Sequence, residues 1–260
     1  MLRLFDCPVA VVRRPQWRAP AGFSVVNTGH NQLVYVGRPD GRFPPYSGAK
    51  LATTIAPQPG RGHESEDSMA DFTTTTGNLE LHDWHGSKLL AQPVLDALTR
   101  FTSEGIIDPA QILGVSENLD EESDTDIFCP RHGLDLAQAG NVVIVHTHKT
   151  RKAPPQFAAA LANGDMRADL NGLVKHTLQV SKVSFAPVAD ATAATGMESG
   201  GMSPIGLPAE WPVLVDARIL ETPTLFIGSG IRPSKLVVNG ALFAYLPGVR
   251  VIEGLGKPRG

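Results

Sequence analysis

Short apolar runs and helical stripes follow one another irregularly between residues 87 and 252, and this mixture most constrains the fold. Strand-like runs lie at 111–115, 141–146, 156–161, 183–185, 213–216, 224–227, 236–238 and 249–252. Helices are expected from Ser87 to Gly105, from Asp169 to Leu178, from Pro187 to Gly196 and over 240–246. Because no strict strand–helix–strand alternation appears, we expect an α+β fold with a mixed, mostly antiparallel sheet and flanking helices.

Turn and cap residues add detail to this expectation. A basic, Pro-containing turn at 149–155 separates the runs at 141–146 and 156–161, which predicts a hairpin. The acidic segment 120–126 precedes a short helix, whose N-terminal dipole favours carboxylates, and Gly133 is expected to end that helix.

The N-terminal quarter of the chain differs from the rest. Residues 1–68 contain 8 Pro and 7 Gly, with two β-like runs at 23–26 and 32–36. Two such runs can pair as a hairpin, which is marginal alone in water. We therefore expect residues 1–72 to be a disordered arm, or an extension that precedes a natural start at Met69, and residues 73–258 to form the domain.

Composition excludes several classes of protein. The chain is 42% hydrophobic, enough for a core, but no apolar run approaches the roughly 18 residues of a membrane span. The first six residues are too short an apolar stretch for a secretory signal, so we expect a cytoplasmic location without a membrane partner. The two cysteines, Cys7 and Cys129, form no CxxC pair, which argues against a thiolate zinc site, and Cys129 is expected to be a buried thiol.

The histidines offer pairs but no complete metal site. His146 and His148 alternate along a predicted strand, and His82 and His85 lie three residues apart, yet neither pair has a third ligand at suitable spacing. No metal and no cofactor is therefore predicted.

Charge is distributed unevenly along the chain. Residues 69–148 carry a net charge of −10 and residues 149–260 a net charge of +4. An RNA partner is therefore expected to meet the basic C-terminal half, although ordinary solvated surface explains the same charges.

The segment 195–208, TGMESGGMSPIGLP, holds four Gly and two Pro between a helix and a strand. Gly lets a ligand approach main-chain N–H groups, and Pro stiffens the backbone on its C-terminal side. The combination predicts a rigid cradle of backbone donors for a carbonyl, a ribose hydroxyl or a phosphate. A tight crossover loop without a ligand is the alternative interpretation.

Gly200-Gly201-Met202-Ser203-Pro204 resembles the GGxxP signature of the YbaK and prolyl-tRNA-synthetase-associated editing family, in the longer form of an actinobacterial branch. Further segments resemble family elements in the same order. These are 128–134, 167–174, 214–216 and 227–232, so that the resemblance spans about 120–255.

The resemblance implies an aminoacyl-tRNA deacylase that edits in trans, with tRNA(Pro) as the first candidate substrate and prolyl-tRNA synthetase as a candidate partner. Attack on the ester would come from water or from the 2′-hydroxyl of the substrate. It implies that Gly200, Gly201 and Asn141 act in catalysis. Substrate-binding residues would be Met202, Ser203, Pro204, Asp216, Gly228, Ser229 and Gly230. Arg232 and Lys235 would contact tRNA phosphates.

One position departs from the family. Many members carry a functional Lys on the strand that we place at 141–146, and Asn141 stands nearest that position. Either Asn141 does a weaker version of the same job, or another cation such as Lys149 reaches in, or the chemistry has changed. The alternative function is therefore a catalytically weakened module of the same fold that binds aminoacyl-tRNA or a nucleotide.

Overall fold

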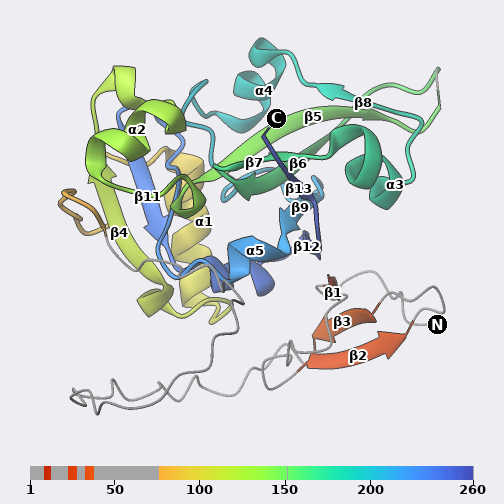
Figure 1. The fold of residues 1–260 in the computed structure, drawn as a ribbon, viewed down its shortest axis with the longest axis horizontal. Coiled ribbons are helices and arrows are strands. Elements are labelled where there is room, and N and C mark those ends of the chain that lie inside the picture. Colours follow the sequence, from red (N-terminus) through yellow and green to blue (C-terminus); the bar gives the residue numbers. More distant parts are fainter. Residues whose placement is uncertain (1–8, 13–22, 28–32, 38–75, 151, 260) are drawn as a thin grey trace, which may run out of the picture.

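The structure is a computed structural model that describes residues 9–12, 23–27, 33–37, 76–150 and 152–259 (Figure 1). The expectation for residues 1–72 falls mostly outside these ranges. Of the described residues before 73, β2 and β3 pair antiparallel, as the two β-like runs predict. β1 joins the main sheet beside β12.

The described strands form three sheets. The main sheet has the order β2-β3-β1-β12-β9-β6-β5-β8, the second has the order β10-β11-β4, and β13 pairs with β7 in the third. The strands are β1 Val9–Val12, β2 Phe23–Asn27, β3 Leu33–Gly37, β4 Ile112–Glu117, β5 Gly140–His148, β6 Gln156–Asn163, β7 Met166–Ala168, β8 Lys182–Phe185, β9 Val213–Asp216, β10 Leu225–Gly228, β11 Ser234–Val238, β12 Val249–Ile252 and β13 Gly256–Pro258.

The main sheet is mixed. β5 pairs antiparallel with β6 and β8, which confirms the predicted hairpin, whereas β6, β9, β12 and β1 are parallel neighbours. The second and third sheets are antiparallel. The α+β prediction with a mostly antiparallel sheet is thus confirmed.

Five α-helices lie within the described residues. They are α1 Gln92–Ser103, α2 Thr125–His132, α3 Lys175–Leu178, α4 Val188–Thr195 and α5 Ala217–Leu220. A π-helical turn, Leu170–Val174, leads into α3, and the predicted helix over 240–246 is a 3₁₀ turn at Gly240–Ala244.

Local sequence explains most helix ends. The Asp124 carboxylate accepts a hydrogen bond from the Asp126 amide at the start of α2, and Gly133 ends the helix with a left-handed φ of 67°. Helix α1 begins later than predicted because Ser87 accepts from the Leu89 amide in a separate turn, and Pro93 lies in the first turn of the helix.

The second sheet is covered on both faces. On one face, Leu236 and Val238 pack with Val94, Leu98 and Phe101 of α1 in the largest hydrophobic cluster. On the other face, Val237 and Phe226 pack with Phe128 and Cys129 of α2. Helix α2 therefore hides the face of the sheet that carries Lys235.

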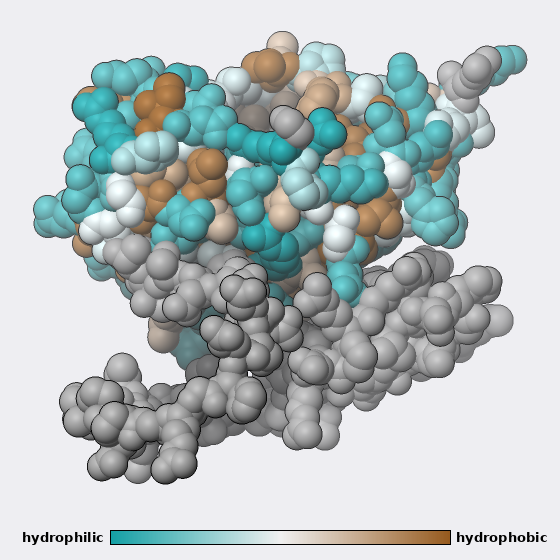
Figure 2. All heavy atoms as spheres, viewed as in Figure 1, coloured by the Kyte–Doolittle hydropathy of each residue, from teal (hydrophilic) through white to brown (hydrophobic). Residues whose placement is uncertain are grey.

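The main and second sheets meet where β5 begins. Ala139 forms a parallel bridge with Phe226, so the start of β5 lies beside β10. This junction, with α2 and the Gly-rich loop around it, positions the candidate site. Figure 2 shows that the visible described surface is largely hydrophilic with scattered apolar patches. Within the described residues, no helix is both long and apolar enough to cross a membrane.

Candidate active site

The Gly-rich loop 196–208 is fixed against the turn between β10 and β11. The Gly230 amide donates to the Gly201 carbonyl oxygen at 2.7 Å, and the Glu198 amide donates to the Gly230 carbonyl oxygen at 2.8 Å. The Glu198 carboxylate also accepts from the Arg232 amide at 2.9 Å. These bonds join two segments about 30 residues apart into one rigid backbone unit, as the Gly–Pro combination predicts.

Glycine is required where these segments touch. A Cβ on Gly228 would overlap the Met202 carbonyl oxygen and lie 2.5 Å from the Gly201 carbonyl oxygen. Gly200 has a φ of +88°, in the region that side chains disfavour, and a Cβ there would lie 2.6 Å from an Arg232 guanidinium nitrogen. The close approach therefore depends on glycine at both positions.

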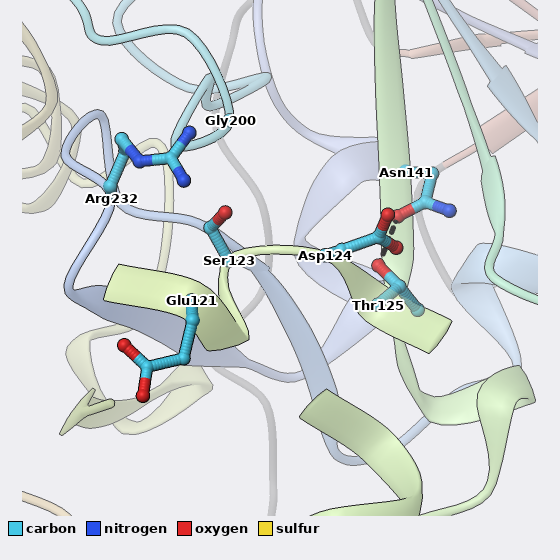
Figure 3. A pocket seen from close by; sticks show the side chains of 7 residues that line it. All are labelled: Glu121, Ser123, Asp124, Thr125, Asn141, Gly200 and Arg232. Carbon is cyan, nitrogen blue, oxygen red and sulfur yellow. Dashed lines mark hydrogen bonds between the residues drawn. The ribbon is translucent and has the colours of Figure 1, made fainter. Parts of the chain in front are cut away.

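Two adjoining hollows open beside this unit. The outer hollow has a volume of about 500 Å³, and Figure 3 shows its seven lining residues: Glu121, Ser123, Asp124, Thr125, Asn141, Gly200 and Arg232. The inner hollow has a volume of about 300 Å³ and shares Ser123, Thr125, Asn141 and Gly200 with the outer one. Its other lining residues are Phe128, Ala139, Gly140, Val142, Val143, Met202, Phe226, Ile227, Gly228 and Lys235. A polar mouth thus leads to an interior with both polar and apolar lining, in which apolar side chains surround a few polar groups.

Asn141 lies on the wall formed by β5. The Thr125 hydroxyl donates to its amide oxygen at 2.6 Å, so that the two side chains point toward one another in Figure 3. No hydrogen bond of the Asn141 amide nitrogen is found among the described residues. The bond from Thr125 thus holds the amide in one orientation and leaves its N–H₂ group as a donor.

Lys235 lies on β11, where it pairs with Gly228 of β10, and is 6% exposed. Its ammonium donates to the Ser123 carbonyl oxygen at 2.7 Å and lies 5.4 Å from the centre of the Phe128 ring. Burial lowers the pKa of Lys235 to about 8. The prediction that Lys235 contacts tRNA phosphates at the surface is wrong, because α2 covers this face of the sheet.

Charged side chains surround the mouth of the outer hollow. The Arg232 guanidinium donates to the Asp120 carboxylate at 2.9 Å and to the Ser199 carbonyl oxygen at 3.2 Å. Asp124 and Glu121 line the same hollow and are exposed. Arg232 is therefore partly neutralised, and the predicted phosphate contact by Arg232 stays a prediction.

The structure separates the two glycines that the sequence paired. Gly200 lines both hollows, and no partner of its amide is found among the described residues. The Gly201 amide donates to the Glu198 carbonyl oxygen at 3.1 Å, and Gly201 is buried. The expectation of two amides that face the hollow is therefore wrong for Gly201, which instead links the loop to Gly230.

Five other predicted binding residues support the site from outside it. Ser203 and Pro204 are buried residues of the loop itself, in which the Ser203 hydroxyl accepts from the Ile205 amide. Ser229 bonds to Ser234 within the turn, and Gly230 bonds to the loop. None of these four lines either hollow.

Asp216, the fifth, is also absent from the lining. Its carboxylate caps α5 and accepts from the Gly256 amide at 2.6 Å, and burial raises its pKa. Since both oxygens serve the backbone, Asp216 has a structural role, and the prediction that it binds substrate is wrong.

Sequence reasoning missed the wall formed by α2. Ser123, Asp124, Thr125 and Phe128 line the hollows, although the acidic segment was interpreted only through the helix dipole. The sequence did contain an indication of this wall, because these residues form a polar run just before a helix, inside the segment that resembles the family.

The donors present suit an ester carbonyl better than a metal ion. Among the described residues, no group of three His, Cys, Asp or Glu side chains could hold a metal. Cys129 lies behind Phe128 rather than in the lining, and burial raises the pKa of its thiol to about 11. The described lining contains neither His nor Cys. In the inner hollow, a Gly amide, an Asn amide and an ammonium are therefore available to stabilise negative charge.

Solved structures share this fold. A candidate trans-editing enzyme for prolyl tRNA synthetase superimposes with a TM-score of 0.52 at 19% identity, over 67% of this chain and 99% of that one. A scaffold protein from work on computational epitope backbone grafting superimposes with a TM-score of 0.51, also at 19% identity and with the same coverage. At this identity the likeness shows the fold alone. No curated protein matches the sequence.

A family model gives the more specific match. The model of the aminoacyl-tRNA editing domain matches residues 129–245. The matched segment supplies Asn141, Gly200, Met202, Gly228 and Lys235 to the inner hollow. The part of the chain that supplies most of the inner hollow is therefore similar to the aminoacyl-tRNA editing domain.

Proposed function

We propose that the chain is an aminoacyl-tRNA deacylase that hydrolyses the ester of a mischarged tRNA in trans. The observation that carries the proposal is the inner hollow of about 300 Å³, which Gly200, Asn141 and Lys235 line within the segment that matches the editing-domain model. Each of these residues brings a hydrogen-bond donor, and donors aimed at a developing oxyanion lower the barrier to acyl transfer.

The lining also favours an attack by water or by the 2′-hydroxyl of the substrate. The Thr125 hydroxyl donates to Asn141, and the described lining holds no imidazole that could activate it or Ser123. A protein nucleophile without an adjacent base is weak at neutral pH. The residues of the hollow would thus orient the ester and stabilise charge.

The lining of the two hollows suits the aminoacyl group, which is present on a charged tRNA and absent from an uncharged one. Asp124 and Glu121 place negative charge at the entrance, where it would attract the α-ammonium group of an aminoacyl ester. Beyond them, Phe128, Met202 and Phe226 provide apolar walls for a small amino acid side chain. Uncharged tRNA offers neither group.

We propose tRNA(Pro) as the first substrate to test and prolyl-tRNA synthetase as a partner, because a similar fold is described as a candidate trans-editing enzyme for that synthetase. A cytoplasmic location follows from the same proposal, since charged tRNAs are used there.

The direct test measures release of labelled alanine or cysteine from mischarged tRNA(Pro) by the full chain. Asn141→Ala is expected to slow release about 10- to 100-fold by removing one donor. Asn171→Ala is the matched control, because Asn171 is exposed on the π-helical turn outside both hollows. Failure to release an amino acid from any charged tRNA would rule out the enzyme.

A second candidate, a binding module without turnover, is favoured by one observation. Asn141 is uncharged at the position nearest the functional Lys of the family. Tight binding of an amide-linked, non-hydrolysable aminoacyl-adenosine together with no ester hydrolysis would establish this second function instead.

A further inference from the structure

Lys235 is a buried cation without a carboxylate partner. It is 6% exposed, and no ion pair of Lys235 is found among the described residues. Taking an ammonium out of water is costly, so buried lysines are rare unless they are paired. A lysine at this position is unfavourable for stability alone, because an apolar side chain would fill the same space without the free-energy cost of burying an ammonium.

The contacts of Lys235 leave most of its hydrogen-bonding capacity unused. Its ammonium has three donors, and the only hydrogen bond found for it among the described residues goes to the Ser123 carbonyl oxygen. The Phe128 ring, 5.4 Å away, adds a weak attraction. Two N–H groups are therefore free for a ligand in the inner hollow, which Lys235 lines.

Lys235 lies where it can supply the positive charge that is absent at Asn141. The two residues line the same inner hollow from different sheets, Asn141 from β5 and Lys235 from β11. These sheets meet at the bridge between Ala139 and Phe226, at the floor of the hollow. Lys149, the alternative cation considered from the sequence, is exposed beyond the far end of β5 and lines neither hollow.

We propose that Lys235 is the cation of this active site and binds the carbonyl oxygen of the aminoacyl ester from the β11 wall. The inference rests on the deacylase function proposed above. The ammonium would stabilise the negative charge that develops on that oxygen as water or the 2′-hydroxyl attacks.

The charged and titratable groups around Lys235 come from two elements. Asp124 and Cys129 lie on or beside α2, and Arg232 lies on the turn before β11. Asn141 on β5 and Ser116 on β4 add no charge. Burial is the main reason that the pKa of Lys235 falls to about 8, within a range where deacylation can be measured.

The experiment compares kcat/KM of the wild type, Lys235→Met and Lys235→Arg between pH 6.5 and 9.5, after subtraction of spontaneous ester hydrolysis. Lys235→Met is expected to lose about 100-fold at pH 7, the typical effect of removing one oxyanion donor. The wild-type rate is expected to fall as pH rises through about 8. Lys235→Arg is expected to retain activity and to lose this fall, because arginine stays protonated.

Two further variants sharpen the result. Lys182→Met removes an exposed lysine of β8 and is expected to change kcat/KM less than twofold. Asn141→Lys in the Lys235→Met background returns an ammonium to the hollow from the β5 wall and is expected to recover at least 10-fold of the lost rate.

The outcomes are distinguishable. An active wild type with Lys235→Met within threefold of it and an unchanged pH profile would overturn the role of Lys235 and leave the deacylase function standing. A wild type that releases no amino acid from any charged tRNA would overturn both.

Discussion

Gly228→Ala tests whether the closeness of the Gly-rich loop to β10 makes the site. The added Cβ would overlap the Met202 carbonyl oxygen and lie 2.5 Å from that of Gly201. Carbon–oxygen contacts normally exceed roughly 3.3 Å, so the loop must withdraw by about 1 Å or more. The backbone at Gly228 has no positive φ, so the effect comes from this collision rather than from conformational strain.

A displacement of this size is expected to lower kcat/KM about 100-fold, because a 1 Å misplacement of a positioning group has that effect. Overpacking should also reduce the free energy of unfolding by about 1–3 kcal/mol. Urea unfolding gives the stability, and release of amino acid from mischarged tRNA gives the rate at a concentration where the variant is folded.

Gly86→Ala is the matched control. Gly86 has a φ of +63° and open space around its Cβ position, so alanine there costs about 1–2 kcal/mol of strain without a collision. It is expected to destabilise the chain to a similar extent and to keep the wild-type rate. A Gly228→Ala protein with more than half of the wild-type kcat/KM would refute the requirement for close loop packing.

Four further predictions concern stability and reactivity. Because burial lowers the pKa of Lys235 from 10.5 to about 8, the unfolded chain binds more protons between these values, and wild-type stability rises with pH across them. Lys235→Met should therefore raise the free energy of unfolding by up to about 3 kcal/mol at pH 7, a gain that fades above pH 8. Asp216→Ala should lower it by roughly 2 kcal/mol and leave the rate per folded molecule unchanged, since it loses a helix cap and a buried amide acceptor outside the hollow. In a Cys7→Ser background, the Cys129 thiol should resist a disulfide reagent at pH 8 until urea unfolds the chain, because burial raises its pKa to about 11. A chain that begins at Met69 should melt at the same midpoint as the full chain if residues 73–258 form the domain by themselves; a lower midpoint would assign stability to β1–β3, of which β1 pairs with β12.

The sequence predicted the elements whose signals are local. Asp124 and Asp169 cap their helical turns, and Gly133 and Gly196 end helices with left-handed φ values, as their residue types indicate. Helix α5 was missed because its four residues, Ala217–Leu220, are too few to show a periodicity. Strands β7 and β13 were not predicted for the same reason, since each has only three residues.

The lining of the site depends on contacts that no local pattern reveals. The resemblance implied that Gly228, Ser229 and Gly230 lie at the pocket, and the turn that they form does lie against the Gly-rich segment. Which of the two glycine amides faces the hollow depends on the bond from Gly201 to Glu198, a detail of loop geometry. The wall formed by α2 required knowing that this helix packs on the second sheet.

The proposal for Lys235 depends on where its side chain lies in space, which the sequence did not indicate. A lysine within a short strand ordinarily indicates a solvated face, and here that inference failed because α2 covers the face on which Lys235 lies. An active site needs a charge at a place in space rather than at a place in the sequence. Since β5 and β11 come from sheets that meet at one hollow, either strand can deliver an ammonium to it. If Lys235 acts as proposed, Asn141 keeps a hydrogen-bond donor on β5, and Lys235 supplies from β11 the charge that a lysine on β5 would carry.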